Sequence, residues 1–332
     1  MGTPKFLVTT PLPSPGMEIL EAAGEVVCGT EPPSRKRLLE MCASGQIDVL
    51  VSQLTDELDS SILAEARIVG ISNYAAGVSN IDLETATSRS ILVANTPGML
   101  TEATADLAML LVLGTARRVV EADKFVRNGE FAGWKPDLLL GSDVSGSTLG
   151  LAGFGRIARA VARRALAFNM TVISCPRPPR NRAVSQAELG EFAGRVQILD
   201  WNTLLEQSDF VSLHIPLTSD THHLINGAAL GRMKRTAILI NTSRGPVVDE
   251  EALVQALRNG QILAAGLDVY ENEPALAPGL AGLPNSVLLP HLGSATATVR
   301  AEMARVCAEN AVAMAGGQIP AFPVNRDAWS SV

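Results

Sequence analysis

Short apolar runs alternate with segments of helical periodicity throughout the first hundred residues. Apolar runs bounded by turn residues predict buried strands, which are expected at 5–9, 47–51, 68–71 and 91–93. Helical patterns fall between these runs or beside them, at 17–23, 34–44 and 81–88. Strands and helices that alternate in this way predict a small doubly wound α/β domain with a parallel sheet.

A second block of the same kind begins at Thr148. Its predicted strands lie at 148–152, 171–174, 196–198, 210–213, 237–241, 264–269 and 287–289. Helical segments such as 157–167 and 250–258 fit between them, and a last one follows at 296–315. Between the blocks, residues 101–128 predict one long helix that bridges two domains, forms a subunit interface or packs in the core of one domain.

Composition agrees with a two-domain globular chain and excludes several other classes. At about 150 residues per domain, 332 residues suggest two domains. Hydrophobic residues make up 47% and charged residues 18%, so a sizeable core can form and global disorder is excluded. The net charge is −7, whereas a nucleic-acid-binding protein is expected to carry a cluster of basic residues, so we expect no nucleic-acid partner. Because the overall charge opposes anions, local groups must hold any anionic ligand.

The lengths of the apolar runs argue against a membrane protein, and the spacing of cysteines and histidines argues against a metal site. The most apolar run, 107–116, stops at Arg117, well short of the roughly 20 residues that span a bilayer. The first residues contain no apolar stretch of signal-peptide length. The four cysteines lie far apart, with no CxxC pair and no histidine at metal-ligand spacing. We therefore expect a cytoplasmic protein with reduced thiols, no membrane association and no metal.

A glycine-rich turn opens the second block. Residues 149–158 read LGLAGFGRIA, an apolar strand that runs into Gly153-x-Gly155-x-x-Ala158 and then into a helical segment. This is the dinucleotide fingerprint in its strand–turn–helix setting. Gly153 allows the tight turn, Gly155 lets the backbone approach a pyrophosphate, and Ala158 lets the helix pack on the strand. The N–H groups at the helix start then meet the negative charge.

The residues after the next strand indicate which dinucleotide is bound. An NAD site usually carries an acid there, about 20 residues after the glycines, to bind the ribose hydroxyls. This chain has CPRPPRNR instead, in which Arg177, supported by Arg180 and Arg182, can bind a 2′-phosphate. The sequence therefore favours NADP(H) over NAD(H), and a solvated basic turn is the alternative.

Three reactive side chains follow predicted strands of the second block. Arg244 comes after 237–241, Glu273 follows the strand that contains Asp268, and His291 follows 287–289. Ligands of an open α/β sheet bind beyond the carboxyl ends of its strands, so these groups are expected on one side of the ligand cleft.

Several motifs, matched in order along nearly the whole chain, resemble the D-2-hydroxyacid dehydrogenase family. They include the segment from NTPGMLTEATADLAM to VRNGEF, the glycine loop, INTSRG, GLDVYENEP and PHLGSAT, and they are most similar to the glyoxylate/hydroxypyruvate reductase branch. The resemblance implies a flavodoxin-like substrate domain of residues 1–100 and 296–332. A Rossmann dinucleotide-binding domain of residues 101–295, which includes the helix 101–128, is inserted into it. It also implies a homodimer.

The resemblance further implies the site residues. The catalytic set is Arg244, Glu273 and His291. Cofactor contacts are implied at Gly153, Phe154, Gly155, Arg156, Ile157, Arg177, Pro216, Thr242, Asp268 and Gly293. Substrate contacts are implied at Ala76, Gly77, Leu100, Arg244 and His291. Val78 and Ser79 stand where the family often has an aromatic residue and an acid, which leaves the shape of the substrate pocket open.

These residue types suit the reduction of a 2-keto acid. His291 can donate a proton to the carbonyl oxygen, Glu273 can orient and stabilise the charged ring, and Arg244 can bind the carboxylate and polarise the carbonyl. We therefore predict NADPH-dependent reduction of glyoxylate and hydroxypyruvate to 2-hydroxy acids.

Other readings stay open. The enzyme alternatives are another 2-keto acid, such as 2-ketogluconate or a phenylpyruvate, and an oxidising role on phosphite or formate, although Glu273 argues against formate. A dinucleotide-sensing corepressor of the same fold is the non-enzyme alternative. His214 is interpreted as structural, and His222 and His223 as surface residues. Trp134 either packs in a core or interface or reaches a neighbouring subunit's site.

Overall fold

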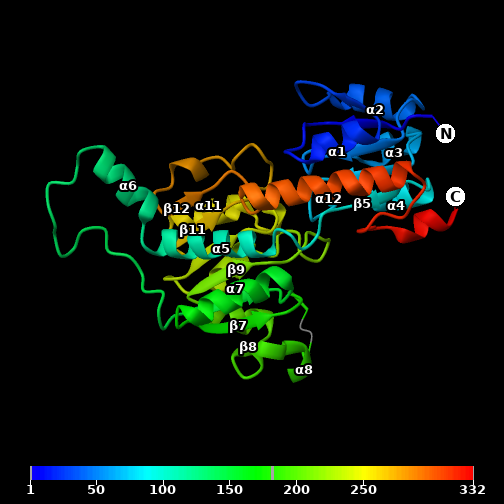
Figure 1. Ribbon diagram of the computed structural model, residues 1–332. Coiled ribbons are helices and arrows are strands. Elements are labelled where there is room, and N and C mark those ends of the chain that lie inside the picture. The colour runs from blue at the N-terminus through cyan, green and yellow to red at the C-terminus, as the bar shows by residue number, and fades with distance from the viewer. Residues whose placement is uncertain (1, 181–182, 332) are drawn as a thin grey trace. The chain divides into compact units, whose positions relative to one another are not determined.

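The computed structural model describes residues 2–180 and 183–331, and its chain forms two compact α/β units (Figure 1). Unit 1 comprises Met1–Leu100 and Ser294–Val332, and unit 2 comprises Thr101–Gly293. Unit 2 is therefore an insertion in unit 1. The second boundary lies two residues before the predicted one.

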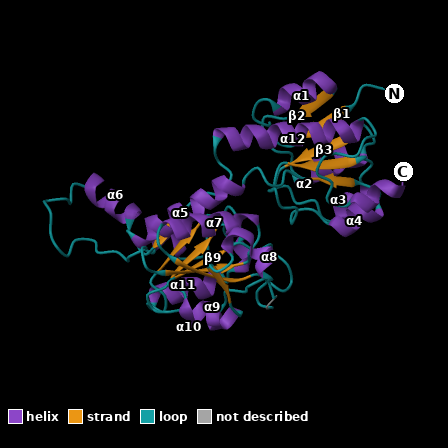
Figure 2. Ribbon diagram, turned by 60° about the horizontal axis from the view of Figure 1, so that its bottom comes forward, coloured by secondary structure: helices purple, strands orange, loops and turns teal. Residues whose placement is uncertain are grey.

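Unit 1 is built on a five-stranded parallel sheet in the order β2-β1-β3-β4-β5, the flavodoxin-like order (Figure 2). The strands are β1 Lys5–Val8, β2 Glu25–Cys28, β3 Val49–Ser52, β4 Gly70–Asn73 and β5 Leu92–Ala94. The helices are α1 Gly16–Ala23, α2 Arg35–Ala43, α3 Ser60–Glu65, α4 Leu83–Ser88 and α12 Ala297–Ala315. One apolar core packs the sheet against α1 and α12, and a second packs it against α2, α3 and α4.

Helix α12 closes unit 1 from the far end of the chain. The Ser72 hydroxyl donates to the Cys307 carbonyl at 2.7 Å, and the Tyr74 hydroxyl donates to the Arg300 carbonyl at 2.9 Å. Met303, Ala304 and Ala308 are buried against the sheet. The C-terminal helix thus belongs to the first block, as the resemblance implied.

Unit 2 is built on a seven-stranded parallel sheet in the order β12-β11-β10-β9-β6-β7-β8. The strands are β6 Thr148–Ala152, β7 Thr171–Cys175, β8 Val196–Ile198, β9 Phe210–Leu213, β10 Ile238–Asn241, β11 Ala264–Leu267 and β12 Ser286–Leu288. The main helices are α5 Thr101–Ala116, α7 Arg156–Ala167, α9 Trp201–Gln207, α10 Gly227–Arg232 and α11 Glu250–Arg258, with the short α8 Gln186–Leu189. Chain order reverses at β6, the switch point at which open α/β sheets bind ligands.

The predicted helix 101–128 is wrong as a single element. α5 ends at Ala116 and α6 begins at Val119, because Arg118 adopts a left-handed backbone with φ of 53°. The returning chain supplies the reason: the Ser142 N–H donates to the Ala116 carbonyl at 2.9 Å, and Gly141 packs directly on that carbonyl. This contact comes from a residue 26 positions further along the chain (142 minus 116), so the sequence around Arg118 does not reveal the break, although Gly114 stands in the last turn of α5.

The segment from α6 (Val119–Arg127) to Gly141 projects from the body of unit 2 (Figures 1 and 2). α6 has no buried residue, and the loop after it carries exposed apolar side chains. No helix within residues 2–180 and 183–331 is long and apolar enough to cross a membrane.

Candidate active site

The ends of β6, β7 and β9 form what we call the glycine edge of unit 2. Gly153 has φ of 94°, and a Cβ there would lie 2.6 Å from the carbonyl oxygen of His214, so this position excludes any side chain. Gly155 caps α7, and a Cβ there would meet open space. Among the described residues no side chain caps the first turn of α7, so its N–H groups can bind an anion. Ala158 is fully buried.

His214 follows β9 and lies behind the glycine turn. Its Nε2 is 2.9 Å from the Ser212 hydroxyl, and burial lowers the pKa of the ring to about 4. The imidazole is therefore neutral at pH 7, and only its carbonyl approaches Gly153.

The segment after β7 carries the arginines predicted to select the cofactor. Arg177 is exposed, and no ion pair involves it within the described residues. The Arg180 guanidinium, in contrast, lies 2.9 Å from the carboxylate of Asp220. Arg182 lies outside the described residues. Arg177 is thus the free guanidinium in the described part of this segment.

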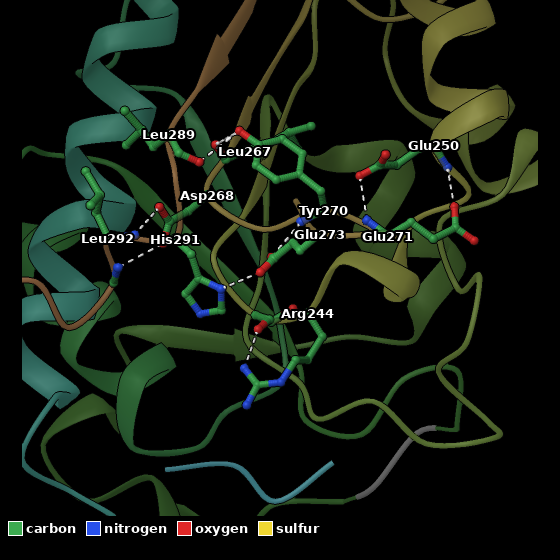
Figure 3. Close-up of polar contacts among 12 residues, drawn as sticks. Arg244, Glu250, Leu267, Asp268, Tyr270, Glu271, Glu273, Leu289, His291 and Leu292 are labelled. Atoms are coloured by element: carbon green, nitrogen blue, oxygen red, sulfur yellow. Dashed lines mark hydrogen bonds and ion pairs between the residues drawn. The ribbon is translucent and has the colours of Figure 1, made fainter. Parts of the chain in front are cut away.

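The ends of β10, β11 and β12 form the histidine edge of unit 2, shown in Figure 3. Arg244 follows β10, Glu273 follows β11 and His291 follows β12, so adjacent strands carry the three side chains. The His291 ring points toward the Glu273 carboxylate, with 2.9 Å between Nδ1 and Oε2. Each side chain keeps 28% of its surface exposed. Nε2 of His291 is then the ring atom left for a proton transfer.

Asp268 holds the loop that carries His291. It follows β11 rather than lying in it, and its carboxylate accepts the Leu292 N–H at 2.6 Å and the Gly293 N–H at 2.8 Å. The His291 N–H donates to the Asp268 carbonyl at 2.9 Å, and His291 takes a left-handed backbone with φ of 55°. Burial raises the pKa of Asp268, although these N–H bonds and the charge of His291 oppose the shift. Sequence reasoning missed this contact, because strand spacing does not reveal which loop a carboxylate binds.

A close backbone contact joins the loops of Arg244 and Glu273. A Cβ on Gly245 would lie 1.8 Å from the carbonyl carbon of Tyr270, so only glycine fits. The Tyr270 N–H donates to Glu273 Oε1 at 2.9 Å, and its hydroxyl donates to the Leu289 carbonyl at 2.8 Å. Tyr270 therefore connects all three loops of the histidine edge.

The charges of this edge depend on one another. Burial would raise the pKa of Glu273, but the hydrogen bonds from His291 and the Tyr270 N–H, with the charges of His291 and Arg244, outweigh burial and keep the pKa below its ordinary value. Burial lowers the pKa of Arg244, while the charge of Glu273 opposes the shift. No carboxylate pairs with Arg244 in the described part of the chain, and its guanidinium donates to the Ser243 carbonyl at 2.7 Å. A partly buried cation without a carboxylate partner among the described residues suits an anionic ligand.

The other predicted cofactor contacts lie on loops at the carboxyl ends of the same sheet. The hydroxyl of Thr242, directly after β10, is buried without a hydrogen-bond partner among the described residues. The Pro216 carbonyl accepts the Thr221 hydroxyl at 2.7 Å, and the Gly293 carbonyl accepts the Thr104 hydroxyl at 2.9 Å. The orphaned hydroxyl and the open space at Gly155 fit a dinucleotide lying across these strand ends. Phe154, Arg156 and Ile157 form the turn and first residues of α7.

The predicted substrate loop belongs to unit 1. Ala76 and Gly77 follow β4, and amide side chains fix their carbonyls: Asn95 donates to Ala76 at 2.6 Å and Asn73 donates to Gly77 at 3.0 Å. Leu100 ends unit 1 immediately before α5. The loop is thus held by its own unit, with Val78 and Ser79 exposed in part at its tip.

Comparisons with known proteins agree with this architecture. The sequence model of the family "D-isomer specific 2-hydroxyacid dehydrogenase, NAD binding domain" matches residues 109–293, more than half of the chain. A glyoxylate reductase of Thermococcus litoralis is 46% identical over 99% of this chain and 98% of its own length, and one of Korarchaeum cryptofilum is 46% identical over 98% and 96%.

Solved structures are similar over the same length. A Thermus thermophilus protein has a TM-score of 0.85 at 44% identity and covers 96% of this chain and 99% of its own. An NADPH-dependent glyoxylate/hydroxypyruvate reductase of Sinorhizobium meliloti, in complex with NADP and malonate, has a TM-score of 0.83 at 30% identity and 98% coverage of both chains.

A parallel sheet with a dinucleotide turn at its switch point, together with the family model and the relatives, shows a nicotinamide-dependent oxidoreductase. The chain belongs to the D-isomer specific 2-hydroxyacid dehydrogenase family. The predicted family and the predicted fold class are therefore confirmed.

Proposed function

We propose that this enzyme reduces glyoxylate and hydroxypyruvate to 2-hydroxy acids with NADPH, giving the D-hydroxy acid from the latter. The observation that carries the proposal is the 2.9 Å contact between His291 and Glu273, near an Arg244 guanidinium without a carboxylate partner in the described residues. Relatives named glyoxylate reductase, up to 46% identical over nearly the full length, support the substrate class.

The residues of the histidine edge divide the chemistry among them. A bound reduced nicotinamide supplies hydride to the carbonyl carbon. His291, charged and oriented by Glu273, donates its Nε2 proton to the carbonyl oxygen. Arg244 binds the substrate carboxylate and stabilises the negative charge that develops on the carbonyl oxygen. In unit 1, the N–H groups near Ala76 and Gly77 and the side chain of Leu100 are the proposed substrate contacts.

NADPH is favoured because positive charge replaces the usual acid after β7. Arg177 is exposed and free of ion pairs in the described chain, so its guanidinium can bind a 2′-phosphate through two parallel N–H bonds. The Sinorhizobium meliloti reductase, which is NADPH-dependent by its description, supports this choice.

Steady-state rates over a panel of keto acids test the proposal. Glyoxylate, hydroxypyruvate, 2-ketogluconate and phenylpyruvate are each measured with NADPH and with NADH. We expect kcat/KM to be highest for glyoxylate or hydroxypyruvate with NADPH. Preference for a bulkier keto acid would reject the substrate assignment, and dinucleotide binding without turnover of any substrate would favour the corepressor reading.

We further propose a homodimer formed through the projecting segment of unit 2. Trp134 is 81% exposed, and Val126, Phe131 and Leu140 are exposed as well. A cavity of about 530 Å³, lined by Leu140, Leu263 and Val287 among others, opens beneath this segment. Exposed apolar patches of this kind mark protein interfaces.

We assign the protein to the cytoplasm, because all four cysteines are free thiols.

Sedimentation measurements test the dimer. We expect a mass of two chains for the wild type and of one chain for Val126→Glu combined with Leu140→Glu. Val69→Glu, at a valine of unit 1 that is 48% exposed against 59% for Val126, is the matched control and should stay dimeric. A monomeric wild type would contradict the assignment.

A further inference from the structure

Two histidines and a glutamate meet in unit 2 outside the histidine edge. His222 and His223 lie in the turn between β9 and α10, and Glu271 follows β11. The two imidazole rings stack with centroids 4.0 Å apart, and His223 Nε2 is 2.6 Å from Glu271 Oε1. One potential ligand atom from each residue lies within 4.8 Å of the other two. The sequence hides this cluster, because Glu271 is 48 residues from His223.

Hydrogen bonds hold the backbone of two of the three residues in place. The His223 N–H donates to the Pro246 carbonyl at 2.8 Å. The Glu271 N–H donates to Glu250 Oε1 at 2.9 Å, and Glu271 Oε2 in turn accepts the Glu250 N–H at 3.4 Å, as Figure 3 shows. His222 is exposed, so its ring can turn without disturbing the core. The cluster thus has two fixed ligands and one adjustable ligand.

The charge around the cluster is negative. Glu250 is buried behind Glu271, and the Glu271 N–H donates to its carboxylate, so two acidic side chains lie on this side of the cluster. The two imidazoles bring no negative charge of their own but offer nitrogen lone pairs when neutral. Such surroundings favour a small divalent cation over an anion.

We propose that His222, His223 and Glu271 bind a divalent transition-metal ion of the Zn²⁺ class. Two imidazole nitrogens and one carboxylate oxygen suit Zn²⁺, Co²⁺ and Ni²⁺, whereas Mg²⁺ and Ca²⁺ prefer oxygen ligands alone. In a tetrahedral site, ligands at about 2.0–2.1 Å from the metal are roughly 3.3 Å apart, which rotation of the exposed His222 ring can reach. Solvent supplies the fourth ligand. The metal takes the place of the His223–Glu271 hydrogen bond.

This site is independent of the proposed reductase activity. It shares no side chain with Arg244, Glu273 and His291, although Glu271 lies two residues before Glu273 and His223 is bonded to Pro246, two residues after Arg244. The test therefore measures metal binding itself, so that failure of the metal site and failure of the proposed activity are distinguishable.

Titration of the tag-free protein with Co²⁺, followed by its visible d–d absorption, tests the site. We expect one equivalent to bind with the spectrum of a four-coordinate ion and to be displaced by Zn²⁺. His222→Ala removes an exposed ligand and leaves the core intact. It should weaken Co²⁺ binding at least about tenfold, the lower end of the loss that follows even when outer partners of metal ligands are removed. Glu271→Gln should weaken it as well.

His291→Asn is the matched control, because it removes the other histidine–glutamate pair of the sheet edge. It should bind Co²⁺ as the wild type does. Absence of saturable binding at one equivalent, unchanged binding in His222→Ala, or loss of binding in His291→Asn alone would each overturn the proposal.

Discussion

The glycine edge and the histidine edge lie at the carboxyl ends of one sheet, yet they are built by different means. At the glycine edge, the backbone itself shapes the site: a positive φ at Gly153, open space at Gly155 and a buried Ala158. At the histidine edge, side chains and loops hold one another, through Asp268, Tyr270 and the Glu273–His291 pair. Damage at the first edge should therefore appear as lost stability or cofactor affinity, and damage at the second as lost turnover in a folded protein.

The strongest way to break this contrast is to replace His291. In His291→Asn we expect kcat to fall about 10³-fold, in the range attributed to a general acid, because asparagine cannot donate the proton. Asparagine tolerates the left-handed backbone of this position better than alanine does. The His291 side chain is partly exposed, so the free energy of unfolding should change by less than about 1 kcal/mol.

Single-turnover rates and NADPH titration of His291→Asn measure both halves of this expectation. The dissociation constant of NADPH should stay near that of the wild type, since the glycine edge is untouched. A variant that still turns over at the wild-type rate would remove the acid role from His291.

The next largest effect is expected from Arg177→Ala at the glycine edge. Loss of a charge-assisted contact worth about 1.5–3 kcal/mol should raise the KM for NADPH roughly 10- to 100-fold and leave the KM for NADH nearly unchanged. Arg180→Ala is the matched comparison, because the Arg180 guanidinium is already paired with Asp220 at 2.9 Å. This substitution should raise the KM for NADPH, relative to that for NADH, by less than Arg177→Ala does. Equal effects of Arg177→Ala on both dinucleotides would remove the NADP(H) assignment.

The sequence predicts a feature well where the interacting residues are close along the chain, and poorly where they are far apart. The helix at 250–258 was predicted to the residue, since its periodicity and the capping Asp249 are local. Edge strand β2 was not predicted, because its apolar run, Val26 to Cys28, is short and its residues are partly exposed. The break at Arg118 and the Asp268 contact with the His291 loop depend on segments that are distant in sequence. Local patterns thus define the glycine edge, but not the supports of the histidine edge.

Within the glycine edge, substitutions of Gly153 and Gly155 should separate an effect on stability from an effect on cofactor binding. Gly153→Ala should lower the free energy of unfolding by about 1–3 kcal/mol, since an alanine there adopts a positive φ and meets the His214 carbonyl at 2.6 Å. Gly155→Ala meets nothing and should leave the stability of the free protein unchanged, but its methyl group should weaken NADPH binding. Urea unfolding with and without NADPH measures both. Equal destabilisation by the two substitutions would contradict the assignment of Gly155 to ligand approach.

The smallest expected effect concerns His214, whose titration makes the free energy of unfolding depend on pH. The pKa of His214 in the folded protein is about 4, below the ordinary 6.5. Between pH 4 and 6.5 the ring is therefore protonated in the unfolded chain but neutral in the folded one. The contribution of His214 to the free energy of unfolding is therefore complete above pH 7, falls as pH drops from 6.5 toward 4, and is lost below that. The full shift corresponds to about 3 kcal/mol, and we expect 1–2 kcal/mol because the ring retains some solvent contact.

His214→Gln removes this titration and keeps a side-chain hydrogen-bonding group for Ser212. The free energy of unfolding is measured in urea at pH 7, 6, 5 and 4.5 for both proteins, and their difference cancels the titration of the carboxylates. The loss of stability between pH 7 and 4.5 should be smaller in the variant by that 1–2 kcal/mol. Parallel pH profiles would mean that the ring is protonated as easily in the folded chain as in the unfolded one, which would contradict the pKa shift of His214.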